Sequence, residues 1–123
     1  MAWEGELEEL RRREALARQM GGAEKVKRQH DGGRLTVRER IDALVDAGSS
    51  HEVRALSGRA SYDGQGNLAA VVPANCIVGG ARADGRPIVV CGDDFTVRGG
   101  SADATIKEKT VMAEQMAHEF RLP

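Results

Sequence analysis

Apolar residues recur at helical spacing in the first part of the chain. Over residues 3–20, a stripe formed by Trp3, Leu7 and Leu10 predicts a helix, and a glycine pair directly after it predicts where the helix stops. Charged residues fill most of the remaining surface of this helix. Such a narrow apolar stripe on a charged helix is typical of a helix that packs on the outside of a larger body.

The segment LTVRERIDALVDAG, residues 35–48, carries the clearest local pattern. Thr36 occupies an N-cap position and Glu39 follows three residues later, which is the spacing of a capping box. The helix that starts there has an apolar face and a glycine stop, formed by Val37, Ile41, Leu44, Val45 and Gly48. Before it, AEKVKRQH (residues 23–30) predicts a short, weaker helix.

After Gly48 the pattern changes from helical to extended. The segment HEVRALS (residues 51–57) alternates between apolar and polar and predicts a strand. Residues 58–70 are rich in glycine and polar side chains and predict a long loop, which in compact domains is usually either functional or disordered.

Two apolar runs around Asp84-Gly85 predict a β-hairpin, because this dipeptide accepts the positive φ values that a tight turn requires. Its second strand contains IVVC, an apolar run without alternation, which predicts a strand covered on both faces. In so short a chain, we expect part of that cover to come from outside it. Exposed apolar surface on this strand and on the last helix would then cause self-association or partial disorder.

The last segment predicts a helix from about Ala104 to Phe120, with Asp103 or Thr105 as its cap. Its apolar face is formed by Ile106, Ala113, Met116, Ala117 and Phe120. The sequence then ends in Arg-Leu-Pro, so the strand and helix resemble a βα unit that is cut before its next strand.

The two cysteines, Cys76 and Cys91, lie on the two strands of the predicted hairpin. The turn register places Val78 opposite Cys91 and Cys76 opposite Asp93, so the cysteines share one face on a diagonal. Ladder geometry separates such positions by roughly 7 Å, too far for an unstrained disulfide. The sequence therefore predicts two reduced, half-buried thiols.

Composition and charge exclude several classes of function. The 123 residues suit one domain with a modest core, and the net charge of −1 provides no overall attraction to nucleic acid or to an anionic membrane. No apolar run approaches the roughly 20 residues of a membrane span, and the N-terminus lacks the pattern of a signal peptide, so we expect a cytoplasmic protein. The sequence shows no metal-ligand pattern: His30 and His51 lack nearby acid or thiol partners and are interpreted as surface residues.

The stretch DDFTVRGGSADATIKEK, residues 93–109, is the candidate binding segment. A strand, two glycines and a helix N-terminus can present backbone N–H groups to an anion. Basic and polar residues flank the turn, namely Arg98, Gly99, Gly100, Ser101, Lys107 and Lys109. Asp93, Asp94 and Asp103 oppose an anion there, and the stretch matches neither the phosphate-loop nor the dinucleotide fingerprint. A plain tight turn is the alternative.

Two stretches resemble the carboxyltransferase (β) subunits of biotin-dependent acyl-CoA carboxylases. The first is GRLTVRERIDALVDAGSSHEV (residues 33–53), which is similar to the family's G-[RK]-L-T-x-R-E-R-I segment. The second covers residues 72–123, where a hairpin leads to D-F-T-V-x-G-G-S and a helix ending in Leu-Pro. One departure is Ser-Ser-His-Glu at residues 49–52, where the family usually has an aromatic residue. The family includes propionyl-, methylcrotonyl- and acetyl-CoA carboxylase β subunits and related decarboxylase subunits of sodium pumps.

The resemblance implies an α/β fold, the N-terminal part of a crotonase-like fold. It implies a reaction that moves a carboxyl group from biotin, carried on a partner protein, to the α-carbon of an acyl-CoA. Further implied partners are a biotin carboxylase or carrier subunit and further copies of the full-length subunit, with no metal. The family's oxyanion-hole segments lie after the matched block, so the resemblance assigns no catalytic residue here and predicts that the chain alone is inactive.

The resemblance divides the chain into a helical segment, residues 1–48, and the start of an acyl-CoA-binding domain, residues 49–123. In crotonase-like folds the connection corresponding to residues 95–101 runs beside the CoA, so Arg98, Gly99, Gly100 and Ser101 are the candidate CoA neighbours. Two alternatives stay open: a non-catalytic binding or assembly module, and part of a biotin-dependent decarboxylase subunit.

Overall fold

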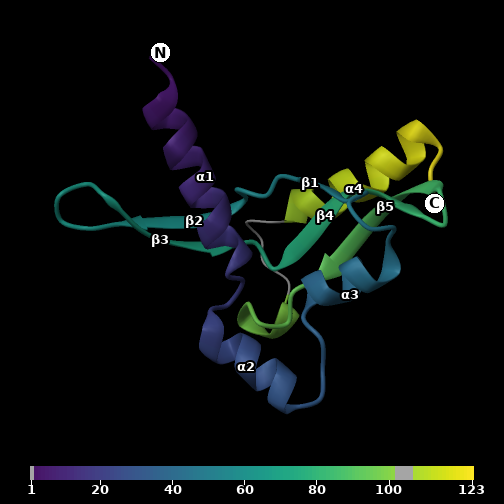
Figure 1. Cartoon of the computed structure of the whole chain (residues 1–123), viewed down its shortest axis with the longest axis horizontal. Helices are drawn as coiled ribbons and strands as arrows, with labels where there is room; N and C mark the ends of the chain where they lie inside the picture. The colour runs from purple at the N-terminus through teal and green to yellow at the C-terminus, as the bar shows by residue number, and fades with distance from the viewer. Residues whose placement is uncertain (1, 102–106) are drawn as a thin grey trace.

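The computed structural model of the chain describes residues 2–101 and 107–123 (Figure 1). Helices α1 (Glu4–Arg18), α2 (Ala23–Asp31) and α3 (Val37–Leu44) come first. Strands β1 (His51–Val53), β2 (Gly58–Tyr62), β3 (Leu68–Pro73), β4 (Cys76–Ala83) and β5 (Arg86–Asp93) follow. A short 3₁₀ turn, η1 (Arg98–Gly100), and helix α4 (Lys107–Phe120) complete the described elements.

The main sheet has the order β1-β4-β5, and both of its pairings are antiparallel. The predicted hairpin is confirmed, with Val78 opposite Cys91 and Cys76 opposite Asp93. Its turn uses positive φ at both positions, 49° at Asp84 and 78° at Gly85. At the other side of β4, a Cβ on Gly79 would lie 2.3 Å from the carbonyl oxygen of His51, so only glycine lets β1 approach this closely.

Helices cover both faces of β4. Successive side chains of a strand point to opposite sides, so neighbouring residues of β4 belong to two different core clusters. Helix α3 contributes to a core cluster on one face, made of Val37, Ile41, Ile77, Ala81 and Val90. Helix α4 contributes to the cluster on the other face, made of Cys76, Val78 and Ala113. Two-sided cover was predicted for the IVVC run, which lies in β5: Val90 belongs to the first cluster and Val89 packs against the second, whereas Cys91 is exposed. The chain's own α3 and α4 supply these two layers (Figure 1).

The prediction of a long loop over residues 58–70 is wrong, because this segment forms most of a second hairpin, β2–β3. Its turn is built by the side chain of Asp63, whose Oδ1 accepts from the backbone N–H of Gln65 at 2.8 Å and of Asn67 at 2.9 Å. The strands project away from the main sheet beside α1 (Figure 1). Arg12 of α1 donates to the carbonyl oxygen of Leu68 at 3.0 Å, which fixes the hairpin to the helix.

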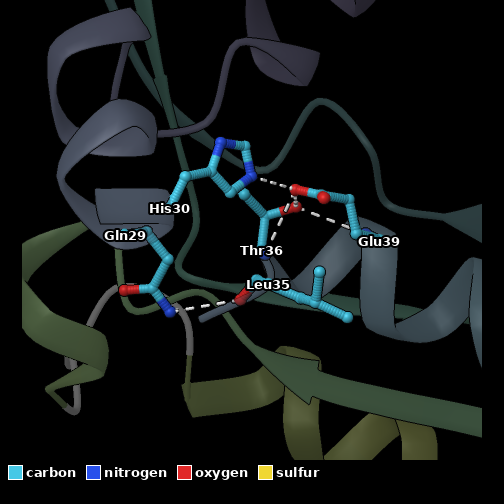
Figure 2. Close-up of polar contacts among 5 residues, drawn as sticks. All are labelled: Gln29, His30, Leu35, Thr36 and Glu39. Carbon is cyan, nitrogen blue, oxygen red and sulfur yellow. Dashed lines mark hydrogen bonds and ion pairs between the residues drawn. The ribbon is translucent and has the colours of Figure 1, made fainter. Parts of the chain in front are cut away.

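The capping box at the start of α3 is confirmed (Figure 2). The N–H of Glu39 donates to Thr36 Oγ1 at 3.3 Å, and the N–H of Thr36 donates to Glu39 Oε1 at 3.3 Å. The same Oε1 lies 2.6 Å from His30 Nε2, so the expectation that His30 lacks an acid partner is wrong. Gln29 Nε2 donates to the carbonyl oxygen of Leu35 at 3.2 Å, so α2 is joined to the start of α3 by two side-chain contacts.

Several predicted apolar faces are less buried than the sequence suggests. In α1, Trp3, Leu7 and Leu10 are 65%, 47% and 40% exposed, and α3 ends at Leu44, which is also exposed. The predicted strand over residues 51–57 shortens to β1, because Arg54 adopts a positive φ of 54° directly after it. Packing inside this chain therefore leaves apolar surface on α1 and at the end of α3.

Helix α4 packs on the sheet through Ala113 and the half-buried Met112, whereas Phe120, predicted on its apolar face, is exposed. The predicted caps Asp103 and Thr105, and Ile106, lie outside the described residues. After α4 the backbone returns to the sheet, where the N–H of Val89 donates to the carbonyl oxygen of Pro123 at 2.9 Å. The chain thus comes back to the outer edge of β5, as a βα unit does.

Cys76 and Cys91 are both free cysteines, and their diagonal placement is confirmed. They are not equally half-buried as predicted: Cys76 is buried and Cys91 is exposed. Their Sγ atoms lie 3.4 Å apart, much closer than the ladder spacing that the sequence suggested. That spacing describes backbone positions, and the two side chains lean toward each other.

Candidate anion-binding site

The loop after β5 is anchored by the buried side chain of Asp94, which is 1% exposed. Its Oδ1 accepts from the backbone N–H of Thr96 at 2.9 Å and from Thr96 Oγ1 at 2.6 Å. The N–H of Asp94 donates to the carbonyl oxygen of Asn75 at 2.8 Å. The sequence argument that Asp94 opposes an anion at this loop is therefore wrong, because the carboxylate is turned into the protein and holds the loop.

The turn that follows adopts the left-handed conformation at three successive residues, with φ of 50° at Arg98, 61° at Gly99 and 70° at Gly100. Two adjacent glycines make such a run possible, because side chains rarely tolerate positive φ. The backbone N–H of Gly100 donates to Val97 at 3.0 Å and that of Ser101 donates to Arg98 at 3.2 Å. These two N–H groups close the turn, so they do not form the anion-binding seat that the glycine pair suggested.

A cluster of basic side chains lies beside this turn and borders a shallow pocket of about 210 Å³. They come from three places in the sequence: Lys25 and Arg28 from α2, Arg34 from the segment after it, and Arg98 from η1. The guanidinium of Arg34 stacks over the exposed ring of Phe95, 5.3 Å from its centroid. The pocket lining is completed by Gln29, Phe95, Thr96 and Gly99. We call this set the basic pocket.

No carboxylate of the described residues lines the basic pocket. Arg28 has Glu24 3.8 Å away on the exposed side of α2, a weak contact between two solvated side chains. Four basic side chains around one pocket favour an anion, since each bound negative charge relieves repulsion among them. The aromatic ring of Phe95 adds a flat surface next to these charges.

The basic pocket depends on a close approach between the α1–α2 joint and the loop. The N–H of Gly21 donates to Thr96 Oγ1 at 3.0 Å. A Cβ on Gly21 would lie 1.9 Å from the carbonyl oxygen of Thr96, so the joint has room only for glycine. This contact brings the start of α2, which carries Lys25 and Arg28, to the loop that carries Arg98, and all three line the basic pocket.

Lys109 does not take part in this site, contrary to the sequence expectation. Its side chain is 3% exposed and interacts electrostatically with Glu52, Cys76 and Cys91 on the sheet and with Arg38. Burial lowers the pKa of Lys109 below its ordinary value. The side chain of Lys107, also expected near the turn, lies outside the described residues.

A second, larger pocket of about 460 Å³ lies between α3 and the sheet, and acidic side chains (Asp42, Asp46 and Glu52) outnumber basic ones (Arg18 and Arg38) in its lining. Arg38 and Glu52 form a bidentate ion pair there, at 2.8 and 3.2 Å. The carboxylate of Asp46 accepts from the backbone N–H groups of Asp84 and Gly85, at 2.9 and 2.8 Å. This pocket offers an anion no excess of cations, so the basic pocket is the stronger candidate.

Within residues 2–101 and 107–123, no group of three or more His, Cys, Asp or Glu side chains could hold a metal ion. None of the helices in those ranges combines the length and apolar character that a bilayer span requires.

A family model described as the carboxyl transferase domain matches residues 28–123, and the chain belongs to this family. The chain is 36% identical over 119 residues to a propionyl-CoA carboxylase beta chain of Roseobacter denitrificans, covering 95% of this chain and 23% of that protein. It is 38% identical over 116 residues to the methylmalonyl-CoA carboxyltransferase 12S subunit of Propionibacterium freudenreichii subsp. shermanii, covering 93% and 22%. The chain thus spans less than a quarter of the length of these curated relatives.

Solved structures agree with this assignment. A transcarboxylase 12S crystal structure with methylmalonyl-coenzyme A and methylmalonic acid bound superposes with a TM-score of 0.78 at 37% identity, covering 93% of this chain and 22% of that one. The beta subunit of P. aeruginosa geranyl-CoA carboxylase superposes with a TM-score of 0.66 at 27% identity, covering 82% and 18%. The predicted family and the predicted fold class, the N-terminal part of a crotonase-like α/β fold, are confirmed.

Proposed function

We propose that this chain is the opening part of an acyl-CoA-binding domain in a biotin-dependent carboxyltransferase. The whole protein would transfer a carboxyl group from carboxybiotin to the α-carbon of an acyl-CoA. The family match over residues 28–123 supports this proposal, as does the likeness to a transcarboxylase with a bound CoA thioester. The chain itself contributes binding, and we assign it no catalytic residue.

The basic pocket is the observation that carries the proposal for this chain. Coenzyme A combines a pyrophosphate, a 3′-phosphate and a flat adenine ring, which are the groups that clustered cations and an aromatic surface bind. We assign Arg98 to a phosphate contact, together with Arg34, Lys25 and Arg28. Gly99 and Gly100 allow the turn, and Ser101 holds it, because Ser101 Oγ donates to the carbonyl oxygen of Arg98 at 2.8 Å.

The remaining parts of the reaction would come from outside this chain. Biotin would be carried on a partner protein, loaded by a biotin carboxylase subunit, and the acyl-CoA would be the substrate. Further copies of the full-length subunit would complete the assembly; the 12S transcarboxylase, to which the chain is similar, is described as a hexamer. The cytoplasmic location and the boundary between residues 48 and 49 stay predictions from the sequence.

A non-catalytic assembly module is the second candidate, favoured by the exposed stripe of Trp3, Leu7 and Leu10 on α1. In that case the chain would bind full-length subunits through α1 and need no CoA. A decarboxylase subunit would share the CoA site and differ only in its partner proteins.

The deciding experiment is CoA binding to the purified chain by calorimetry. We expect Arg34→Ala and Arg98→Ala each to weaken binding by about five- to tenfold, the loss of one charge-assisted contact. Dephospho-CoA, which lacks the 3′-phosphate, should also bind more weakly than CoA. The matched control is Arg59→Ala, an exposed arginine on β2 outside the basic pocket.

Equal CoA affinity for Arg34→Ala, Arg98→Ala and Arg59→Ala would exclude the basic pocket as the CoA site. Absence of CoA binding together with binding to full-length subunits would favour the assembly module. A carboxyl-transfer assay in the reverse direction, from methylmalonyl-CoA to free biotin, should give no propionyl-CoA and no carboxybiotin with the chain alone.

A further inference from the structure

The thiols of Cys76 and Cys91 form an isolated pair on the face of the sheet that α4 covers. They lie on neighbouring strands at diagonal register positions, with 3.4 Å between their Sγ atoms. This distance is the contact distance of two sulfur atoms. A disulfide bond requires about 2.0 Å, so the two sulfur atoms must approach each other by about 1.4 Å to form one.

The two thiols differ in their access to solvent. Cys91 is exposed on β5, which is the outer strand of the sheet, whereas Cys76 is 1% exposed and packs with Val78 and Ala113. A small oxidant can therefore reach Cys91 directly. Cys76 is reached through Cys91, whose sulfur it contacts.

The charges around the pair assign different roles to the two sulfurs. Burial, followed by the contact with Cys91, raises the pKa of Cys76 to about 12. Asp93 also raises it, and the buried ammonium of Lys109 acts in the opposite direction. Cys76 thus stays a protonated thiol at neutral pH and is a poor first nucleophile, since the thiolate is the reactive form. The exposed Cys91 is left as the residue that reacts first.

We infer that Cys76 and Cys91 form a peroxide-sensitive dithiol site that closes to an intrachain disulfide. The Cys91 sulfur attacks one oxygen of hydrogen peroxide, the O–O bond breaks, and a sulfenic acid and one water are produced. The Cys76 sulfur then attacks the Cys91 sulfur, the S–O bond breaks, and the hydroxyl leaves with the Cys76 proton as a second water. Two thiols are oxidised and one peroxide is reduced to two waters.

This inference is independent of the proposed function. The cysteines are not among the residues that line the basic pocket, and carboxyl transfer leaves their oxidation state unchanged. The bond would connect β4 and β5 on the α4 side, at positions that already share one face. The reaction therefore requires no change of register between the strands.

The test treats the folded chain with hydrogen peroxide and maps its peptides after trypsin digestion. Trypsin separates the cysteines into residues 60–82 and 83–98, since the Arg86-Pro87 bond resists cleavage. We expect both thiols to be lost from titration, the intact mass to fall by about 2 Da, and the two peptides to be found linked. A dithiol reductant should restore both thiols.

Two single variants separate the roles of the sulfurs. In Cys76→Ser, Cys91 should form a sulfenic acid that dimedone traps, and without dimedone this acid should be oxidised further. In Cys91→Ser, Cys76 should resist peroxide. Circular dichroism checks that both variants fold, and the peptide map of the unsubstituted chain does not depend on them.

Three results would overturn the inference. The first is a peptide map with Cys91 oxidised to the sulfinic acid and no linked peptides. The second is a disulfide between two chains through Cys91. The third is an equally fast formation of the linked peptides in denaturing urea, which would show that the folded arrangement contributes nothing.

Discussion

At the scale of single residues, two contacts of Thr96 position the candidate site. Gly21 lies against the carbonyl oxygen of Thr96, and Asp94 holds Thr96 from the other side through two hydrogen bonds. The contact of Gly21 with Thr96 could not be predicted, because it joins residues 75 positions apart whose proximity is set by packing. The Asp94–Thr96 hydrogen bonds are local, two positions apart, but the sequence pattern did not show that the carboxylate of Asp94 turns inward to make them. The glycine pair at residues 21–22 was interpreted only as a helix stop, although it also forms the docking point of the loop.

We expect Gly21→Ala to destabilise the fold by about 1–3 kcal/mol, the usual cost of forcing an atom into a packed contact. The added methyl would displace the loop and should also weaken CoA binding. The matched control is Gly5→Ala, since a Cβ there meets nothing within 4 Å and alanine is the better helix former. Urea unfolding of both variants measures the difference, and equal midpoints would contradict the close contact.

The contact between Glu39 and His30 makes a prediction about pH. The hydrogen bond from His30, followed by those from Thr36, lowers the pKa of Glu39 below its ordinary value of 4.5. A carboxyl group with a lowered folded-state pKa stabilises the fold above its unfolded-state pKa, and this contribution is lost as the pH falls through the folded-state pKa.

Glu39→Gln should therefore be less stable than the unsubstituted chain at neutral pH, and this difference should close as the pH falls below about 4.5. Urea unfolding midpoints measured from neutral to acidic pH would show it. His30→Ala should narrow the neutral-pH difference, because it removes the largest cause of the shift. A difference that stays constant over the whole range would contradict the assignment.

At the scale of elements, local signals were predicted well and non-local pairings were not. The capping box of α3 and the Asp84-Gly85 turn are set by residues three or fewer positions apart, so their patterns are visible in the sequence. The β2–β3 hairpin was missed, because glycines and polar residues hide its alternation and the Asp63 side chain builds its turn. Its docking on α1 depends on Arg12 and Arg13, far away in sequence.

The N-cap of α3 should contribute measurably to stability. We expect Thr36→Ala to cost about 1 kcal/mol, the usual effect of removing a side-chain cap. Thr36→Ser keeps the hydroxyl and should lose less. Urea unfolding with both variants measures the ranking, and a serine variant as unstable as the alanine variant would show that the buried methyl group, and not the cap, matters at this position.

At the scale of the whole molecule, the resemblance predicted the family and the fold class, whereas the residues of the basic pocket were only partly found. Arg98 was predicted as a CoA neighbour from the family resemblance of its loop. Lys25, Arg28 and Arg34 were missed, because their convergence on Arg98 depends on how α2 docks against the loop. The spacing of residues along the sequence does not predict which distant segments come together in the fold.

The exposed stripe on α1 predicts self-association of the purified chain. Trp3, Leu7 and Leu10 form a continuous apolar surface of the kind that is normally covered. Sedimentation velocity should show a coefficient that rises with concentration, and the double variant Leu7→Gln/Leu10→Gln should flatten this dependence. Leu44→Gln, on the exposed end of α3, is the matched control. A monomer at every concentration would contradict the prediction.

The narrow space at Gly79 has a consequence for how this sequence can diverge. Every side chain is excluded there by the carbonyl oxygen of His51, so the pairing of β1 with β4 permits one amino acid at this position. A homologue with a larger residue at the aligned position must have moved or abandoned β1. Position 79 can therefore serve as a marker, readable from an alignment alone, for which members of the family retain the three-stranded arrangement.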